Sequence, residues 1–266
     1  MKIHINDVLD FMSCPTLYEY RHVKKIDPPQ PKVGRLTKNS VVELYDEALH
    51  KTMFYIFHRI QDGFFPSVAN VAKTWGNVWV KPRSEQEDIR FRSTSWRDTH
   101  RIKEKQGWEL LKKAHSFFKD NHGTPIMVNY EYEVAIGQHI LVGNIDLVEV
   151  VRNEKGREEI RMTEFLVDER NMPFLHIRRD WNLTAASYAF RKLMQVNEER
   201  IVYHGIISGK RHDTIRDESD FKQLEHLIDI IVKATDMGLF YPSFNERCST
   251  CSYQKMCEKG WFDVKN

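Results

Sequence analysis

Four cysteines, divided between the two ends of the chain, constrain its fold more than any other sequence feature. Cys14 stands alone near the N-terminus, whereas Cys248, Cys251 and Cys257 form a C-x2-C-x5-C triplet near the C-terminus. Two thiolates separated by two residues can reach one metal centre from a single turn, and soft sulfur ligands favour zinc or an iron–sulfur cluster. The spacing therefore predicts a site that joins the two ends of the chain.

Three kinds of site compete for these thiols. A disulfide is disfavoured, because Met1–Asp10 lacks the apolar stretch of a secretory signal peptide and a reducing cytosol keeps thiols free. Zinc remains open, since two close and two distant cysteines can also bind zinc. An iron–sulfur cluster is the interpretation that we prefer. We expect a cytoplasmic location, in a bacterial, archaeal or phage-infected host cell.

Length and composition permit one large folded domain. The 266 residues are 41% hydrophobic, and no apolar run approaches the roughly 18 residues of a membrane span. The 40 basic and 38 acidic residues give a formal net charge of +2. Binding to nucleic acid would therefore depend on local clusters of positive charge. No glycine-rich phosphate loop is present, which argues against ATP hydrolysis by this chain.

Hydrophobic periodicity predicts an α/β core with helical additions. We expect short helical segments within 3–20, broken at Cys14-Pro15. We predict helices at 41–60, 108–118, 183–194 and 221–234, and strands at 127–134, 139–151, 159–169 and 200–207. Residues 1–266 form a single domain in this interpretation, with 61–106 as a helical insertion and 240–266 joining Cys14 in the metal site.

Two predicted strand ends carry carboxylates. Asp146 closes the run Gly143-Asn-Ile-Asp146, and Asp168 and Glu169 follow the apolar run Phe165-Leu-Val. On adjacent strands Asp146 and Asp168 could meet at one edge of the sheet and, with a backbone carbonyl, hold Mg²⁺ or Mn²⁺. Such an ion polarises a phosphate and activates water for hydrolysis. Aspartate is also common at strand ends for structural reasons, so the two residues alone leave both interpretations open.

Four motifs occur in order along the chain: Ser13-Cys14-Pro15 with Tyr18 nearby, Gly143–Asp146, Asp168-Glu169-Arg170, and the cysteine triplet. This order resembles the RecB-like branch of the PD-(D/E)XK nuclease superfamily, specifically its iron–sulfur members, the CRISPR-associated RecB-like exonucleases and the AddB nuclease domain. The resemblance implies a restriction-endonuclease-like fold with a mixed central sheet flanked by helices. It also implies a [4Fe–4S] cluster on the four cysteines, and Mg²⁺- or Mn²⁺-dependent exonuclease or end-processing activity on DNA.

Three positions depart from the family pattern. The lysine of the [DE]-x-K motif would fall at Arg170, which keeps the charge but has a bulky planar head and a very high pKa. The histidine of a G-x-x-x-H helix motif would fall at Lys38, whose ammonium has no lone pair for a metal. Of the helix motif Q-x-x-x-Y only the tyrosine remains, in Thr184-Ala-Ala-Ser-Tyr188. Catalysis would then be weakened or lost, or the lysine's role would have moved elsewhere.

The resemblance assigns roles to individual residues. The expected metal ligands are Asp146, Asp168 and Glu169, and the expected residues around the substrate are Arg170, Tyr188 and, as a replacement cation, Lys38. An alternative register uses Glu164 in place of Asp168. We prefer Asp168, because the apolar run Leu166-Val167 fits a strand that leads into its ligand.

Basic residues alternate with aromatic residues between 81 and 105, a pattern suited to unpaired nucleic acid. The candidate DNA contacts are Arg92, Trp96, Arg97 and Arg101 in this segment, and Arg178 and Arg179 after the predicted metal strand. A solvated helical face with core tryptophans would give the same pattern. Lys210-Arg211-His212 is interpreted as a loop.

The sequence thus leaves three functions open. The first is a metal-dependent DNA exonuclease of the RecB-like type. The second is an inactive nuclease fold that holds single-stranded DNA, DNA ends or a protein partner within a replication, recombination or transcription complex. The third is an unrelated α/β protein held together by zinc. A small protein of this kind suits a phage, plasmid or CRISPR context.

Overall fold

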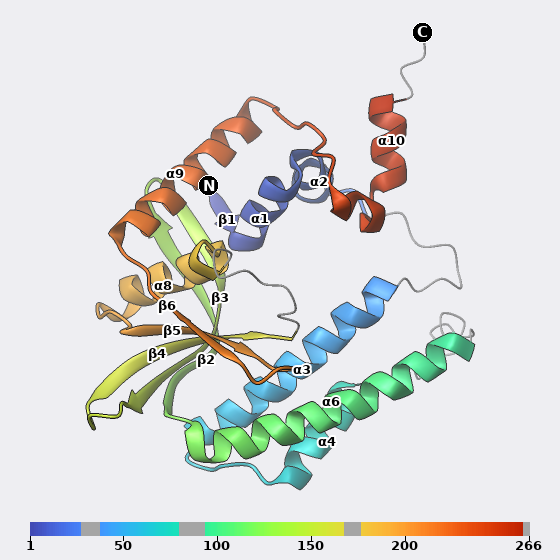
Figure 1. The fold of residues 1–266 in the computed structure, drawn as a ribbon. Helices are drawn as coiled ribbons and strands as arrows, with labels where there is room; N and C mark the ends of the chain where they lie inside the picture. The colour runs from blue at the N-terminus through green and yellow to red at the C-terminus, as the bar shows by residue number, and fades with distance from the viewer. Residues whose placement is uncertain (28–37, 80–93, 168–176, 263–266) are drawn as a thin grey trace.

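The computed structural model, which describes residues 1–27, 38–79, 94–167 and 177–262, has a mixed sheet between two groups of helices (Figure 1). The strands are β1 Lys2–His4, β2 Thr124–Ile136, β3 His139–Arg152, β4 Glu158–Leu166, β5 Arg200–Gly205 and β6 Arg211–Thr214. The helices are α1 Ile5–Ser13, α2 Pro15–Tyr18, η1 Glu19–Val23, α3 Lys38–Gln61, α4 Val68–Val78, α6 Thr94–Asn121, α8 Trp181–Met194, α9 Glu218–Asp236, η2 Glu246–Thr250 and α10 Gln254–Phe262.

Strand β3 is the centre of the sheet. It pairs antiparallel with β2 along one side, and on the other side with β1 near its start and β4 near its end. Strand β5 then runs parallel to β4, and β6 antiparallel to β5. On β3, residues 140–142 pair with β1 and residues 147–152 pair with β4. Asp146 therefore lies between these two ladders, where its side chain can reach backbone groups that the ladders leave free.

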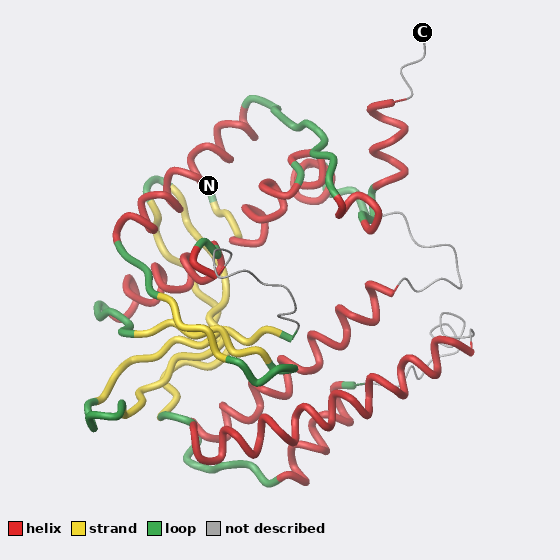
Figure 2. Tube along the Cα trace, viewed as in Figure 1, coloured by secondary structure: helices red, strands yellow, loops and turns green. Residues whose placement is uncertain are grey.

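Two apolar cores, one on each face of the sheet, hold the layers together. The first lies against α1, α8 and α9 and includes Ile145, Phe190 and Ile228. The second lies against α3, α4 and α6 and includes Leu147, Phe57 and Phe118. Figure 2 shows the strands between these two groups of helices. Burial of apolar surface on both faces is the main term that stabilises such a layered fold.

The predicted α/β architecture with a mixed sheet and flanking helices is confirmed, and the element boundaries are the main differences. The break at Cys14-Pro15 is present, because α1 ends at Ser13 and Pro15 begins α2. The predicted helix 108–118 is the end of a much longer helix, α6. The prediction of a loop at 210–212 is wrong, since Arg211 begins β6. Strands β1 and β6 have three and four residues, too few for an alternating pattern to identify them.

No helix in the described part of the chain combines the length and the apolar composition needed to cross a bilayer.

Candidate active site

Two carboxylates meet where the β3–β4 ladder ends. The antiparallel register pairs Leu147 with Thr163, so Asp146 and Glu164 are the next residues on the two strands. Asp146 is 8% exposed, and its Oδ2 accepts a hydrogen bond from the backbone N–H of Phe165 at 3.0 Å. Burial, and then the Asp146 carboxylate, raise the pKa of Glu164 well above its usual value. A cation between the two carboxylates would relieve this repulsion.

A histidine reaches the same point from helix α3. The two ring nitrogens of His50 lie 2.9 Å from the carbonyl oxygen of Asp46 and 2.7 Å from that of Phe165. Both neighbours are acceptors, so both nitrogens must donate, which favours the protonated ring. Burial alone would lower the pKa of His50, but the Asp146 carboxylate and the two carbonyls outweigh it and raise that pKa. His50 therefore lies beside Asp146, whose negative charge favours the protonated ring.

Two asparagines fix the orientation of Asp146. The Asn144 side-chain amide donates to Asn129 Oδ1 at 3.1 Å and to Asp146 Oδ1 at 3.4 Å. Asn129 lies on β2 with a positive φ of 46°, a conformation that asparagine adopts more readily than most residues. This irregularity in β2 brings the Asn129 side chain to Asn144. The carboxylate of Asp146 therefore has a fixed position even though it sits between two ladders.

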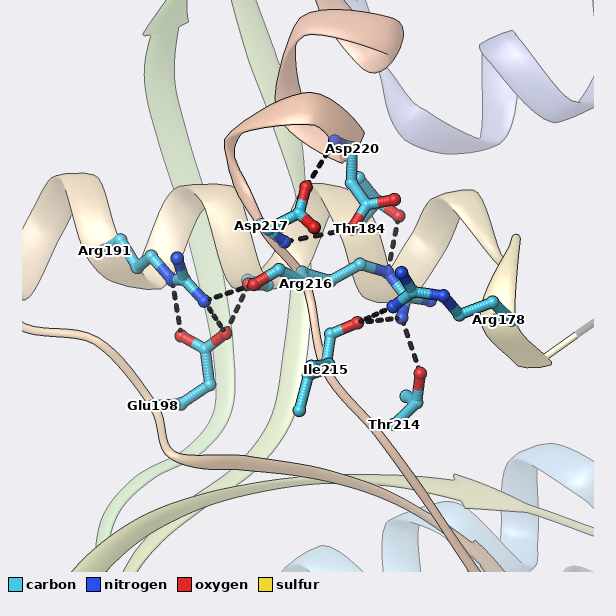
Figure 3. A network of polar contacts seen from close by, with 10 residues as sticks. Arg178, Thr184, Arg191, Glu198, Thr214, Ile215, Arg216, Asp217 and Asp220 are labelled. Atoms are coloured by element: carbon cyan, nitrogen blue, oxygen red, sulfur yellow. Dashed lines mark hydrogen bonds and ion pairs between the residues drawn. The ribbon is translucent and has the colours of Figure 1, made fainter.

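A third carboxylate, Asp180, approaches Glu164 from the start of α8. Asp180 caps this helix by accepting from the N–H of Leu183 at 2.9 Å, and it adds to the raised pKa of Glu164. Arg216, which is 3% exposed, ties the loop before α9 to this helix start (Figure 3). Its guanidinium donates to Thr184 Oγ1, Thr214 Oγ1 and the carbonyls of Ile177, Asp180 and Ile215.

The residue two positions after Glu164 is Leu166, which packs against the first core. Side chains alternate along a strand, so Leu166 and Glu164 project from the same face of β4. A lysine at position 166 would place a cation beside the two carboxylates. Leucine supplies none, and the [DE]-x-K pattern is incomplete when it begins at Glu164.

The structure brings only part of the predicted site together. Asp146 is in the site, and the carboxylate beside it belongs to Glu164, the alternative to Asp168. The predicted ligands Asp168 and Glu169, with Arg170, lie outside the described residues, as does the side chain of Lys38. Their roles remain predictions.

Tyr188 lies away from this point. Its hydroxyl donates to the carbonyl of Ala135 at 2.9 Å. Ala135 is six residues along β2 from Asn129, or about 20 Å at 3.3 Å per residue. The structure therefore does not bring Tyr188 to Asp146.

His50 is the functional residue that sequence reasoning missed. Matching the G-x-x-x-H motif from Gly34 leads to Lys38 instead. A detectable signal was present, because His50 shares one face of α3 with Met53 and Phe57, which are fully buried. A histidine on the apolar face of a helix requires a polar partner in the core, and here that partner is the carbonyl of Phe165.

The four cysteines line one cavity of about 540 Å³ between the two ends of the chain. None of them forms a disulfide. Burial, and then the Cys14, Cys251 and Cys248 thiols, raise the pKa of Cys257, as expected when four thiols share one site. Backbone N–H groups of Ser243 and Asn245 lie 3.4 Å from Cys14 Sγ and 3.5 Å from Cys248 Sγ, respectively.

Contacts between protein groups also join the two ends. The Asn245 side chain donates to the carbonyl of Ser13 at 3.2 Å, and Tyr253 donates to the carbonyl of Ile26 at 2.8 Å. The rings of Tyr20 and Tyr253 lie 5.6 Å apart. Across the described ranges, no three histidine, cysteine, aspartate or glutamate side chains already form a closed metal-binding group.

Of the predicted DNA contacts, Arg101 is exposed on α6 and Arg179 is exposed before α8. Arg178 is partly buried and donates to the carbonyl of Ile215 at 2.9 Å. The side chains of Arg92, Trp96 and Arg97 lie outside the described residues. DNA binding by all six residues remains a prediction.

A family model of the PD-(D/E)XK nuclease superfamily matches residues 6–258. The chain belongs to this superfamily. The solved structure described as "Crystal structure of SSO0001" is similar, with a TM-score of 0.39 and 15% identity over 96% of this chain and 85% of that one. No curated protein matches. Within the matched range the structure places Asp146 beside Glu164, and Leu166 stands two residues after Glu164.

Proposed function

We propose that this protein is a RecB-like nuclease that hydrolyses DNA with the help of a divalent cation held by Asp146, Glu164, His50 and the carbonyl of Phe165. The observation that carries the proposal is the convergence of two carboxylates, one imidazole and one carbonyl from β3, β4 and α3. Carboxylate and carbonyl oxygens suit Mg²⁺ and Mn²⁺, and an imidazole favours Mn²⁺ over Mg²⁺.

Each residue has a distinct task in this proposal. Asp146 and Glu164 provide negative charge, and the Asn144 amide keeps Asp146 in place. His50 must lose its ring proton before a nitrogen can become a ligand, so cation binding would release that proton. A bound divalent cation would polarise the scissile phosphate and lower the pKa of a water molecule.

An iron–sulfur cluster at the four cysteines is the second part of the proposal. A zinc ion is enclosed directly by its sulfur ligands at about 2.3 Å, which leaves little space inside the site. The cavity of about 540 Å³ that all four cysteines line has room for a cluster of several atoms. The two N–H groups near Cys14 and Cys248 could donate to thiolate sulfur and stabilise its negative charge.

This cluster would link chain ends more than 200 residues apart, so its loss should destabilise the fold. Protein purified without oxygen should be brown and absorb visible light, and Cys14→Ala should lose both colour and melting temperature. Colourless protein with stoichiometric zinc would contradict the cluster and support the zinc alternative.

Leu166 favours a second candidate function, that of a DNA-binding or scaffolding subunit without catalysis. Lysine in the [DE]-x-K motif contacts the attacking water and the phosphate, and leucine can do neither. A chain with this substitution could retain the nuclease fold and its partners while its hydrolytic rate falls. Binding of DNA ends or single strands would then be its function.

Degradation of end-labelled single-stranded DNA in Mn²⁺ or Mg²⁺ distinguishes the two candidates. We expect cleavage by the wild type, faster in Mn²⁺, and its loss in Asp146→Ala. Asp213→Ala is the matched control, because Asp213 is an exposed strand aspartate paired only with Arg200 among its described ion pairs. DNA binding without cleavage by the wild type would support the scaffold. Equal cleavage by wild type and Asp146→Ala would reveal a contaminating nuclease.

A further inference from the structure

One buried hydroxyl on the first-core face of the sheet has no hydrogen-bond partner in the part of the chain that the structure describes. Tyr132 on β2 is 2% exposed, and its ring packs in the first core. Its phenol oxygen is buried and has no hydrogen-bond partner among the described residues. Burying an unsatisfied hydroxyl costs free energy, whereas phenylalanine would fill the same space without that cost. A buried tyrosine in this state indicates a polar role for the hydroxyl.

Gly143 is the residue that allows the phenol to take this position. Tyr132 and Gly143 are directly opposite each other in the β2–β3 register. A Cβ atom at Gly143 would lie 2.3 Å from the phenol oxygen and 2.5 Å from Cζ of Tyr132. The hydroxyl end of the ring therefore lies over β3 at a point that only glycine leaves open. This requirement explains the glycine of the Gly143–Asp146 motif in this chain.

The phenol lies on the Glu164 side of the sheet. Tyr132 and Leu166 belong to the same apolar core, and Glu164 projects from the same face of β4 as Leu166. Burial, and then the Glu164 carboxylate, raise the pKa of Tyr132, so the hydroxyl keeps its proton and can donate. A donor and an acceptor on the same face of a sheet that make no direct hydrogen bond can be bridged by one water molecule.

We propose that Tyr132 positions the attacking water of the hydrolytic reaction, by donating a hydrogen bond to a water that Glu164 also holds. This inference rests on the proposed nuclease function. In hydrolysis the oxygen of this water bonds to phosphorus as the P–O ester bond breaks. The water loses a proton to solvent, and the leaving oxygen takes a proton from solvent. Tyr132 thereby supplies the orienting contact that Leu166, in the lysine position, cannot make.

Tyr132→Phe tests the proposal by removing a single oxygen atom. We expect kcat for Mn²⁺-dependent DNA cleavage to fall about 100-fold, the typical effect of losing one positioned donor. KM for DNA and Mn²⁺ binding should stay as in the wild type. The melting temperature should be unchanged or higher, because an unsatisfied hydroxyl is gone. Tyr130→Phe is the matched control, since Tyr130 is on the same strand but 41% exposed.

The possible outcomes separate this inference from the function on which it rests. A Tyr132→Phe variant with wild-type kcat in an active enzyme would overturn the role of Tyr132 and leave the nuclease function intact. A fall in kcat together with weaker Mn²⁺ binding and a lower melting temperature would show a purely structural role. A wild type that neither binds Mn²⁺ nor cleaves DNA would overturn both proposals.

Discussion

A buried ion pair between β3 and β4 offers a sharp test of how the sheet is stabilised. Glu149 is fully buried, and Arg161 is 7% exposed. Glu149 Oε2 accepts from Arg161 Nη2 at 2.9 Å, and its Oε1 accepts from the N–H of Gly123 at 2.8 Å. We predict that Glu149→Gln destabilises the protein strongly, because glutamine can keep the bond to Gly123 but not the charge.

The expected magnitude follows from the charge that is left behind. Removing one partner of a buried pair costs about 3–5 kcal/mol, since the other charge stays buried and uncompensated. The charge of Arg161 would then also act on Arg211 without the compensating carboxylate. Burial, and then Arg161, lower the pKa of Arg211 in the wild type. For a chain of this size, the melting temperature should fall by about 6–20 °C.

Unfolding followed by circular dichroism, in urea and on heating, measures this change. The double variant Glu149→Gln/Arg161→Met should recover most of the loss, because replacing both charges is often close to neutral. Glu158→Gln, at an exposed position on β4, is the matched control and should change little. A loss below about 1 kcal/mol in the single variant, the range of a solvent-exposed pair, would refute the reasoning.

Three further predictions concern the site and its surroundings. In chelator at neutral pH, Glu164→Gln should stabilise the protein by about 1–2 kcal/mol, because it removes a buried charge beside Asp146; a lower melting temperature would contradict this. Burial, and then two neighbouring arginines, lower the pKa of His204 to about 4. The contribution of His204 to stability is therefore complete above about pH 6.5, the pKa of histidine in the unfolded chain. It is lost as the pH falls through 4. His204→Asn should flatten the dependence of unfolding free energy on pH in this window, and an unchanged slope would exclude His204 as its cause. Gly143→Ala should destabilise by about 1–3 kcal/mol through its contact with Tyr132, and a wild-type melting temperature would show that the ring moves freely.

The sequence identified most of the fold because local patterns carry it. Alternating apolar residues marked β2, β3 and β4, and helix-spaced ones marked α3 and α9. The prediction of secondary structure failed where a strand was too short or too polar to show an apolar pattern. The β6 run Arg211-His-Asp-Thr has no apolar alternation, and pairing with β5 alone makes it a strand.

Only part of the candidate site could be predicted from the sequence, for a different reason. Asp146 belongs to a compact local motif and can be found by reading along the chain. The choice between Glu164 and Asp168 depends on the β3–β4 register, which sequence spacing does not determine. His50 is nearly a hundred residues from Asp146 and reaches it only because α3 packs on the sheet. Helical spacing places His50 on the buried face of α3, but it does not identify Asp146 as its neighbour.

Counting bound Mn²⁺ tests the central claim most directly, that Asp146, Glu164, His50 and the Phe165 carbonyl form a cation site. Free Mn²⁺ can be measured by electron paramagnetic resonance during titration of the purified protein. We predict one site in the wild type and in His58→Gln, a control at an exposed position of the same helix, and its loss in Asp146→Asn and His50→Gln. Equal binding by all four proteins would contradict the account.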